Sequence, residues 1–196
     1  KLKLKHIIIG YDHRFGKGRE ASVTDLKKYS SEFNFVLDEI DAQEIEKIAI
    51  SSTKIRNSIN EGDLKTTKIY LGRFFSLTGK VVKGDGLGKQ IDYPTANISI
   101  KEDYKIIPKD GVYYIKTTID NNLYNGMMNI GHRPTIGTKE KSIEVNLFNF
   151  NTDIYDRVVS IDVVEKIRDE KKFASIEALK TQLAKDQEHC LKLINK

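Results

Sequence analysis

The sequence has few of the residues that mark disulfides, metal sites or membrane spans. One cysteine, Cys190, stands among 196 residues, which excludes an internal disulfide and any zinc site that needs two thiolates from one chain. The four histidines show no metal-ligand spacing, and no apolar stretch approaches the roughly 20 residues of a membrane helix. Tryptophan and low-complexity tracts are also absent. With 39% hydrophobic and 31% charged residues, the chain is expected to fold into one or two globular domains.

Charge of one sign is concentrated nowhere along the chain. The formal net charge is +5, and residues 1–73 contain 14 basic and 11 acidic side chains. Because nucleic-acid-binding proteins usually cluster Lys and Arg on one stripe, the interleaved signs favour a solvated mixed surface. Neither nucleic acid nor a membrane is therefore expected as a partner. The stretch from Lys1 to Lys5 is too short and too charged for a signal peptide, so a cytoplasmic location is expected.

Strands alternate with helices in residues 1–73. An apolar run at 4–9, closed by Gly10, predicts a buried parallel strand, and Thr24 is a candidate cap for a helix that reaches about Glu32. Further strands are expected at 33–40 and 45–50, and further helices at 53–60 and 63–71. This alternation predicts an α/β unit with a parallel sheet.

The pattern changes at residues 72–75, where we place a domain boundary between residues 73 and 74. All three prolines and nine of the thirteen glycines fall in residues 72–137. Apolar runs that alternate with polar residues follow at 75–82, 112–119, 123–130, 142–150 and 158–167. From Ser175 the apolar residues recur at helical spacing. Residues 74–196 therefore predict an antiparallel barrel, which removes exposed sheet edges by closure, and a C-terminal helix.

Two neighbouring motifs in the second domain suit phosphate chemistry. Gly84-Asp-Gly-Leu-Gly-Lys89 would let backbone N–H groups converge on a phosphate, with Lys89 supplying charge. Its spacing is neither that of a dinucleotide-binding fingerprint nor that of a Walker A loop, and it also suits a flexible hairpin. In Pro94-Thr-Ala-Asn97, Thr95 and Asn97 would share one face of an extended segment and could ligate Mg²⁺ or meet phosphate. The alternative is an ordinary strand start.

Two further motifs carry candidate site residues. Glu144 lies between apolar neighbours in a predicted strand, where its carboxylate could accept a proton from an attacking hydroxyl or simply face outward. In the first domain, a predicted helix start follows a strand, and free N–H groups at such a start attract anions. The residues there that would add donors are Ser51, Ser52, Thr53 and Arg56. Asp12 follows the first strand, where α/β sheets place ligands.

Taken in their order along the chain, these sequence motifs resemble those of bacterial bifunctional riboflavin kinase/FMN adenylyltransferases (FAD synthetases). Residues 10–19 and 50–56 are similar to motifs of the adenylyltransferase domain. The string Leu71-Gly-Arg-Phe-Phe-Ser-Leu-Thr-Gly-Lys-Val-Val82 is similar to the junction into the kinase. The strings similar to the kinase are 84–97, 129–135, Glu144 and 167–173.

The resemblance implies a fold and a set of roles. It implies that residues 1–73 are the C-terminal part of a Rossmann-like nucleotidyltransferase domain, and that residues 74–196 are a six-stranded antiparallel barrel with a C-terminal helix. The implied reaction is phosphorylation of riboflavin by ATP, with Mg²⁺, to give FMN. Glu144 would be the base. The implied binding residues are Thr95 and Asn97 for Mg²⁺ and phosphate, Gly84 and Lys89 in a flap over ATP, Tyr155 on the nucleotide side, and Arg168, Lys171 and Phe173 over the flavin.

Two departures from the family pattern stand out. Members commonly carry His two residues after the base, where this chain has Asn146. The adenylyltransferase domain normally opens with a His-x-Gly-His-type motif, and none of the four histidines has that spacing. We therefore expect the first half of that domain to be absent, and expect this chain not to convert FMN to FAD. Two alternatives stay open from the residues alone: a flavin-binding barrel without catalysis, and a basic nucleic-acid-binding barrel.

Overall fold

A computed structural model gives the fold of residues 4–41, 44–45, 48–84, 88, 91–132 and 141–194. The chain divides into two compact units, residues 1–51 and residues 52–196. In the described part of the chain, no helix is both long and apolar enough to cross a membrane.

The first unit is a small α/β layer. Its elements are β1 (His6–Gly10), η1 (Lys17–Arg19), α1 (Val23–Phe33), β2 (Val36–Ile40), β3 (Glu44–Ile45) and β4 (Ile48–Ala49). Strands β1 and β2 pair in parallel, which confirms the predicted parallel pairing. The prediction that this strand is buried is wrong, since Ile9 is its one buried residue and Ile8 is 64% exposed. Ile9 of β1 packs against Val23 and Leu26 of α1, and this contact buries one face of the helix.

Two details of the first unit differ from the sequence prediction. Helix α1 begins one residue before the predicted cap Thr24, because the N–H and the hydroxyl of Ser22 both donate to the Asp25 carboxylate, at 2.8 and 2.9 Å. These hydrogen bonds also lower the pKa of Asp25. The strand predicted at 45–50 is wrong, since β3 and β4 are two short antiparallel strands.

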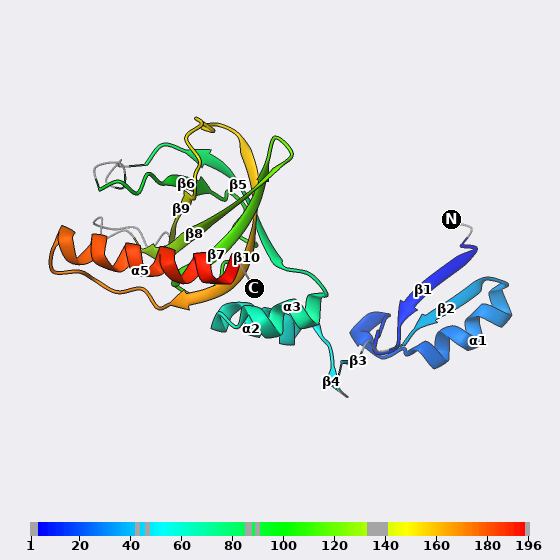
Figure 1. The fold of residues 1–196 in the computed structure, drawn as a ribbon. Coiled ribbons are helices and arrows are strands. Elements are labelled where there is room, and N and C mark those ends of the chain that lie inside the picture. Colours follow the sequence, from blue (N-terminus) through cyan, green and yellow to red (C-terminus); the bar gives the residue numbers. More distant parts are fainter. Residues whose placement is uncertain are drawn as a thin grey trace. The chain divides into compact units, whose positions relative to one another are not determined.

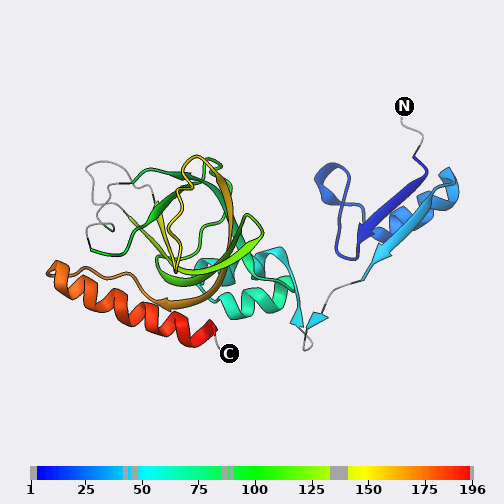
Figure 2. The same cartoon turned by 45° about the horizontal axis from the view of Figure 1, so that its top comes forward.

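The second unit contains a closed barrel and helices that accompany it (Figures 1 and 2). Its elements are α2 (Ser52–Glu61), α3 (Leu64–Leu71), β5 (Phe75–Val82), β6 (Ala96–Ser99), β7 (Gly111–Ile119), β8 (Asn122–His132), β9 (Lys141–Leu147), β10 (Val158–Arg168) and α5 (Ile176–Ile194). The strands close in the order β10-β5-β6-β9-β8-β7, and every neighbouring pair is antiparallel. The predicted six-stranded antiparallel barrel with a C-terminal helix is therefore confirmed.

Alternating side chains give the barrel an inner core and an outer apolar face. In β7, Tyr113 and Ile115 belong to the interior cluster, whereas Val112 and Tyr114 point outward and pack with Cys190 of α5. This alternation is the period of two that a strand imposes. Helix α5 consequently covers the outer side of the barrel, where Figure 1 shows it running past β7 and β8.

Helices α2 and α3 belong to the same compact unit as the barrel. Leu64 at the start of α3 is 3% exposed and joins the interior cluster of the barrel, and Ser58 of α2 hydrogen-bonds to Thr67 of α3 at 2.8 Å. The compact units thus divide after Ser51. The domain boundary at residues 73 and 74 is a separate, sequence-based division, and it stays a prediction.

Replacing Leu64 by Ala is expected to destabilise the second unit by about 2–5 kcal/mol, because it leaves a cavity where α3 meets the barrel core. Chemical denaturation of the whole chain measures the loss. Ile69→Ala is the matched control, since Ile69 lies on the same helix and is 54% exposed. Equal stability of the two variants would show that the packing of α3 against the barrel core does not stabilise the second unit.

The thiol of Cys190 is expected to be unreactive in the folded chain. Cys190 lies on the face of α5 that packs on the barrel and is fully buried there, and burial raises the pKa of its thiol to about 12. The thiol therefore stays protonated at pH 10, where an exposed cysteine is mostly a thiolate. A disulfide-exchange reagent is expected to label Cys190 only after denaturation, and rapid labelling of folded protein at pH 10 would contradict this packing.

Candidate active site

A pocket of about 250 Å³ lies between the outer face of the barrel and the first turns of α5. We call it the α5 pocket. Its apolar wall comes from Val112, Met127, Met128, Leu179 and Leu183, and its polar groups come from Thr95, Asn129, Glu144, Asn146, Arg168, Glu170 and Lys171. A mainly apolar hollow with a few placed polar groups is typical of a small-molecule site.

The barrel register sets the polar side of this pocket. Glu144 of β9 lies directly opposite Asn97 of β6 on one side and Asn129 of β8 on the other. Directly opposed residues on adjacent strands project to the same face of a sheet. Three neighbouring strands therefore present a carboxylate and two carboxamides in one row.

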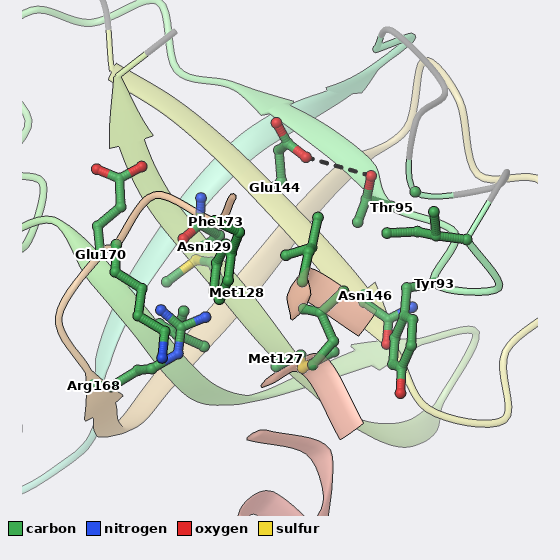
Figure 3. A pocket seen from close by; sticks show the side chains of 16 residues that line it. Tyr93, Thr95, Met127, Met128, Asn129, Glu144, Asn146, Arg168, Glu170 and Phe173 are labelled. Carbon is green, nitrogen blue, oxygen red and sulfur yellow. Dashed lines mark hydrogen bonds between the residues drawn. The ribbon is translucent and has the colours of Figure 1, made fainter. Parts of the chain in front are cut away.

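Thr95 and Glu144 face each other at one end of the pocket (Figure 3). The Thr95 hydroxyl donates to Glu144 Oε2 over 3.5 Å, which is a long hydrogen bond. Pro94, just before Thr95, is held by Asn146, whose Nδ2 donates to the Pro94 carbonyl at 2.8 Å. Asn146, which stands where the resemblance implies a His, thus supplies a hydrogen bond to the segment that carries Thr95.

A second hollow, of about 570 Å³, meets the α5 pocket at Thr95. We call it the Tyr155 hollow, because Tyr155 lines it together with Thr95 and the 151–154 segment. The Lys83 ammonium lies 5.8 Å from the centre of the Tyr155 ring. Thr95 lines both hollows, and its hydroxyl donates to Glu144, which lines the α5 pocket.

The opposite side of the α5 pocket is formed by the segment 168–173, which we call the pocket loop. Figure 3 shows Arg168 and Glu170 on the side of the pocket away from Thr95. The Phe173 ring centre lies 5.6 Å from Arg168 Cζ and 5.2 Å from Lys171 Nζ. The structure therefore brings the three predicted flavin-side residues to one wall of the pocket, and their role in binding stays a prediction.

The glycine-rich motif at residues 84–89, which is predicted to bind phosphate, lies only partly within the described residues. Gly84 lies beside Asn97, since a Cβ built on Gly84 would stand 1.8 Å from Asn97 Nδ2. Gly88 lines the α5 pocket, and its carbonyl accepts from the N–H of Tyr93 at 2.8 Å. Lys89 lies outside the described residues, so its predicted place over a phosphate stays a prediction.

The donors near Glu144 suit a hard divalent cation. Thr95 offers a hydroxyl oxygen, Asn97 a carboxamide oxygen and Glu144 a carboxylate on adjoining segments, and Mg²⁺ prefers oxygen ligands. Within the described residues, no group of three or more His, Cys, Asp or Glu side chains could hold a metal ion. The donor set therefore fits a magnesium ion that takes its remaining ligands from substrate phosphates and water.

The predicted adenylyltransferase residues fall in both compact units. Asp12 follows β1 and Ser51 ends the first unit, whereas Ser52, Thr53 and Arg56 stand in the first turns of α2 in the second unit. Their side chains are exposed. The predicted helix start at these hydroxyls is confirmed by α2, and their role stays a prediction.

Sequence reasoning gave no role to Asn129, Glu170 or the paired methionines of the α5 pocket. Asn129 and Met127 both project outward from β8 into the pocket. An asparagine inside an apolar strand signals such a position, because a buried polar group needs a partner.

Comparison with known proteins shows the family of this chain. Residues 71–194 match the riboflavin kinase family. The chain belongs to the riboflavin kinase family. Residues 1–54 match the FAD synthetase family, so the resemblance stated from the sequence is confirmed in both parts.

Curated relatives of this riboflavin kinase family member are named as bifunctional enzymes. The chain is 38% identical over 199 residues to the bifunctional riboflavin kinase/FMN adenylyltransferase of Buchnera aphidicola subsp. Schizaphis graminum, covering all of this chain and 63% of the relative. It is 38% identical to that of Listeria monocytogenes, covering 95% of this chain and 59% of the relative. The chain thus spans about 60% of the length of the relatives it matches.

A solved structure has the same fold. A crystal structure described as a macrolide-efflux protein from Streptococcus pneumoniae superposes with a TM-score of 0.82 and 37% identity, covering 92% of this chain and 59% of that one. The similarity supports the arrangement of the elements, and the efflux named there belongs to that protein.

Proposed function

We propose that the chain transfers the γ-phosphoryl group of ATP to the terminal hydroxyl of the ribityl chain of riboflavin, giving FMN and ADP. The observation that carries this proposal is the place of Thr95, which lines both hollows and donates to the Glu144 carboxylate. Phosphoryl transfer needs two substrates placed end to end with charge-stabilising groups at the junction, and no covalent intermediate on the protein.

Riboflavin would occupy the α5 pocket. Its flat isoalloxazine ring suits the apolar wall of Met127, Met128 and Leu183, with Phe173 beside it. The polar ribityl chain would then run past Asn129 towards Glu144. Arg168 and Lys171 add donors for the carbonyl groups of the ring.

ATP would occupy the Tyr155 hollow, with its phosphates towards Thr95. Tyr155 offers a half-exposed aromatic surface for the base, and the glycine segment that contains Gly84 would cover the phosphates. Thr95 and Asn97 would hold Mg²⁺. When bound, that ion neutralises charge on the transferring and leaving phosphate oxygens.

Glu144 would act as the general base. As the ribityl oxygen forms its bond to the γ-phosphorus, the hydroxyl proton passes to the Glu144 carboxylate. The bond between the γ-phosphorus and the bridging oxygen breaks, and ADP leaves with that oxygen. The hydroxyl of Thr95, which donates to Glu144 at 3.5 Å, would keep the carboxylate turned towards this junction.

Chromatographic separation of flavins tests the proposal. The purified chain, incubated with riboflavin, ATP and Mg²⁺, is expected to produce FMN and ADP in equal amounts, and chelation of the metal is expected to stop the reaction. FAD is not expected, because the sequence has no His-x-Gly-His-type motif. Bound riboflavin that is never phosphorylated would instead indicate a flavin-binding barrel without catalysis.

A further inference from the structure

The pocket loop is tied to helix α5 by a buried carboxylate. Asp186 of α5 is 2% exposed. Its oxygens accept from Arg168 Nε at 3.1 and 3.0 Å, and Arg168 Nη2 lies 2.8 Å from Asp186 Oδ2. Because two guanidinium nitrogens contact one carboxylate, both the position and the plane of the Arg168 guanidinium are fixed.

Gln182, one helical turn before Asp186, extends this contact to a second residue of the loop. Its Nε2 donates to Asp186 Oδ1 at 2.7 Å, and its Oε1 accepts from Lys171 Nζ at 2.6 Å. A continuous hydrogen-bonded chain therefore runs from Lys171 through Gln182 and Asp186 to Arg168. We call it the α5 clamp.

The α5 clamp fixes the two cations that flank Phe173. Arg168, Lys171 and Phe173 all line the α5 pocket, whereas Gln182 and Asp186 do not. The Phe173 ring lies within 6 Å of both cationic groups, a distance at which cation–π attraction operates. The positions of all three pocket residues therefore depend on two helix residues that lie outside the pocket.

Burial of this ion pair is not explained by stability alone. Removing a carboxylate and a guanidinium from water costs about as much as their attraction returns, and apolar replacements are often equally stable. A buried pair is better explained where orientation matters, and here Arg168 is oriented towards a pocket. The clamp also orders the loop before any ligand arrives, which lowers the entropic cost of binding.

We propose that Asp186 and Gln182 are positioning residues that set the affinity for the flavin by holding Arg168, Lys171 and Phe173 in place. This inference rests on the proposed function, since it takes riboflavin to be the occupant of the α5 pocket. Arg168, at one end of the clamp, lies on the side of the pocket away from Thr95 and Glu144 (Figure 3). Loss of the clamp is therefore expected to weaken flavin binding and to leave ATP binding nearly unchanged.

Riboflavin titration followed by fluorescence tests the clamp. Asp186→Asn is expected to weaken riboflavin binding about 10-fold, as the loss of a hydrogen bond to a charged group does, and Gln182→Met about 3-fold. The KM for ATP is expected to stay within about 2-fold. A general loss of folding would instead lower the amount of active protein and leave both the riboflavin Kd and the KM for ATP unchanged. Glu188→Gln is the matched control: it removes one carboxylate from α5, where the exposed Glu188 pairs with Lys192 at 2.7 Å.

A double variant shows whether Asp186 acts through Arg168. In an Arg168→Gln background, Asp186→Asn is expected to change riboflavin affinity less than about 2-fold, because the partner is already gone. A full additional 10-fold loss would contradict the clamp, as would equal affinities of Asp186→Asn and Glu188→Gln. Gln182 is only partly buried, so Gln182→Met tests the clamp even where Asp186→Asn fails to fold.

Failure of the proposed function can be told apart from failure of the clamp. If the parent chain makes no FMN, the proposed function is wrong, and amide hydrogen exchange of residues 168–173 without ligand still tests the clamp. Faster exchange in Gln182→Met than in Glu188→Gln would support it. Equal exchange in the two variants would overturn it.

Discussion

Replacing Glu144 by Gln is expected to lower kcat for FMN formation by about 100- to 10,000-fold, the range that a general base contributes. Glutamine keeps the size of the side chain and can still accept from the Thr95 hydroxyl, but it cannot take the ribityl proton. The pocket keeps its shape, so the Kd for riboflavin, measured by fluorescence titration, is expected to change little. Catalysis and binding therefore separate in this variant.

Glu165→Gln is the control for this substitution. Glu165 is also a barrel residue, on β10, where it pairs with Lys65 at 3.8 Å, and it does not line either hollow. It is expected to retain full activity. If Glu144→Gln kept the activity of Glu165→Gln, the proton would have to leave by another route, and Glu144 would not be the base.

Replacing Gly84 by Ala is expected to lower kcat/KM for ATP by about 100-fold, the effect of displacing a positioned group by about 1 Å. The added methyl group would stand 1.8 Å from Asn97 Nδ2. Because that atom is the end of a side chain, the Asn97 amide can turn away, and the barrel is expected to stay folded. The variant therefore loses the Asn97 carboxamide from its position beside Glu144. The affinity for riboflavin is expected to be unchanged.

Two further variants identify the cause of the Gly84→Ala effect. Asn97→Ala is expected to show the same loss, and adding Gly84→Ala to it should cost little more, because the displaced group is already gone. Gly10→Ala is the control for an added methyl group, since its nearest neighbour would lie 3.7 Å away. Full activity of Gly84→Ala would show that Asn97 holds neither metal nor phosphate.

The elements that could be predicted from sequence are those with a local signal. The alternation at 75–82 and 112–119 predicts strands that the structure has at β5 and β7, because inward and outward residues of a barrel strand differ in polarity. The helical spacing after Ser175 predicts α5. Strand β6 is only four residues long, which is too short to show a period, and the sequence indicated no more there than an extended segment.

The parts that could not be predicted depend on contacts between distant residues. Glu144 meets Thr95 across 49 positions, and only the closure of the barrel brings β6 beside β9. Arg168 meets Asp186 across 18 positions. The spacing of α5 puts Asp186 on the same face as Leu183 and Cys190, but it does not show which residue of the barrel pairs with it. The packing of Leu64 into the barrel interior likewise depends on tertiary structure, since α3 alone is an ordinary short helix.

The most direct test of the central claim follows the phosphoryl group itself. The experiment uses ATP that carries ¹⁸O in the three non-bridging positions of its γ-phosphoryl group. This ATP is incubated with riboflavin, Mg²⁺ and the purified chain, and the masses of the products are measured by mass spectrometry. All of the label is expected in FMN and none in ADP, because the γ-phosphoryl group moves to the ribityl oxygen beside Glu144. Label only in inorganic phosphate, with riboflavin unchanged, would contradict the proposed transfer.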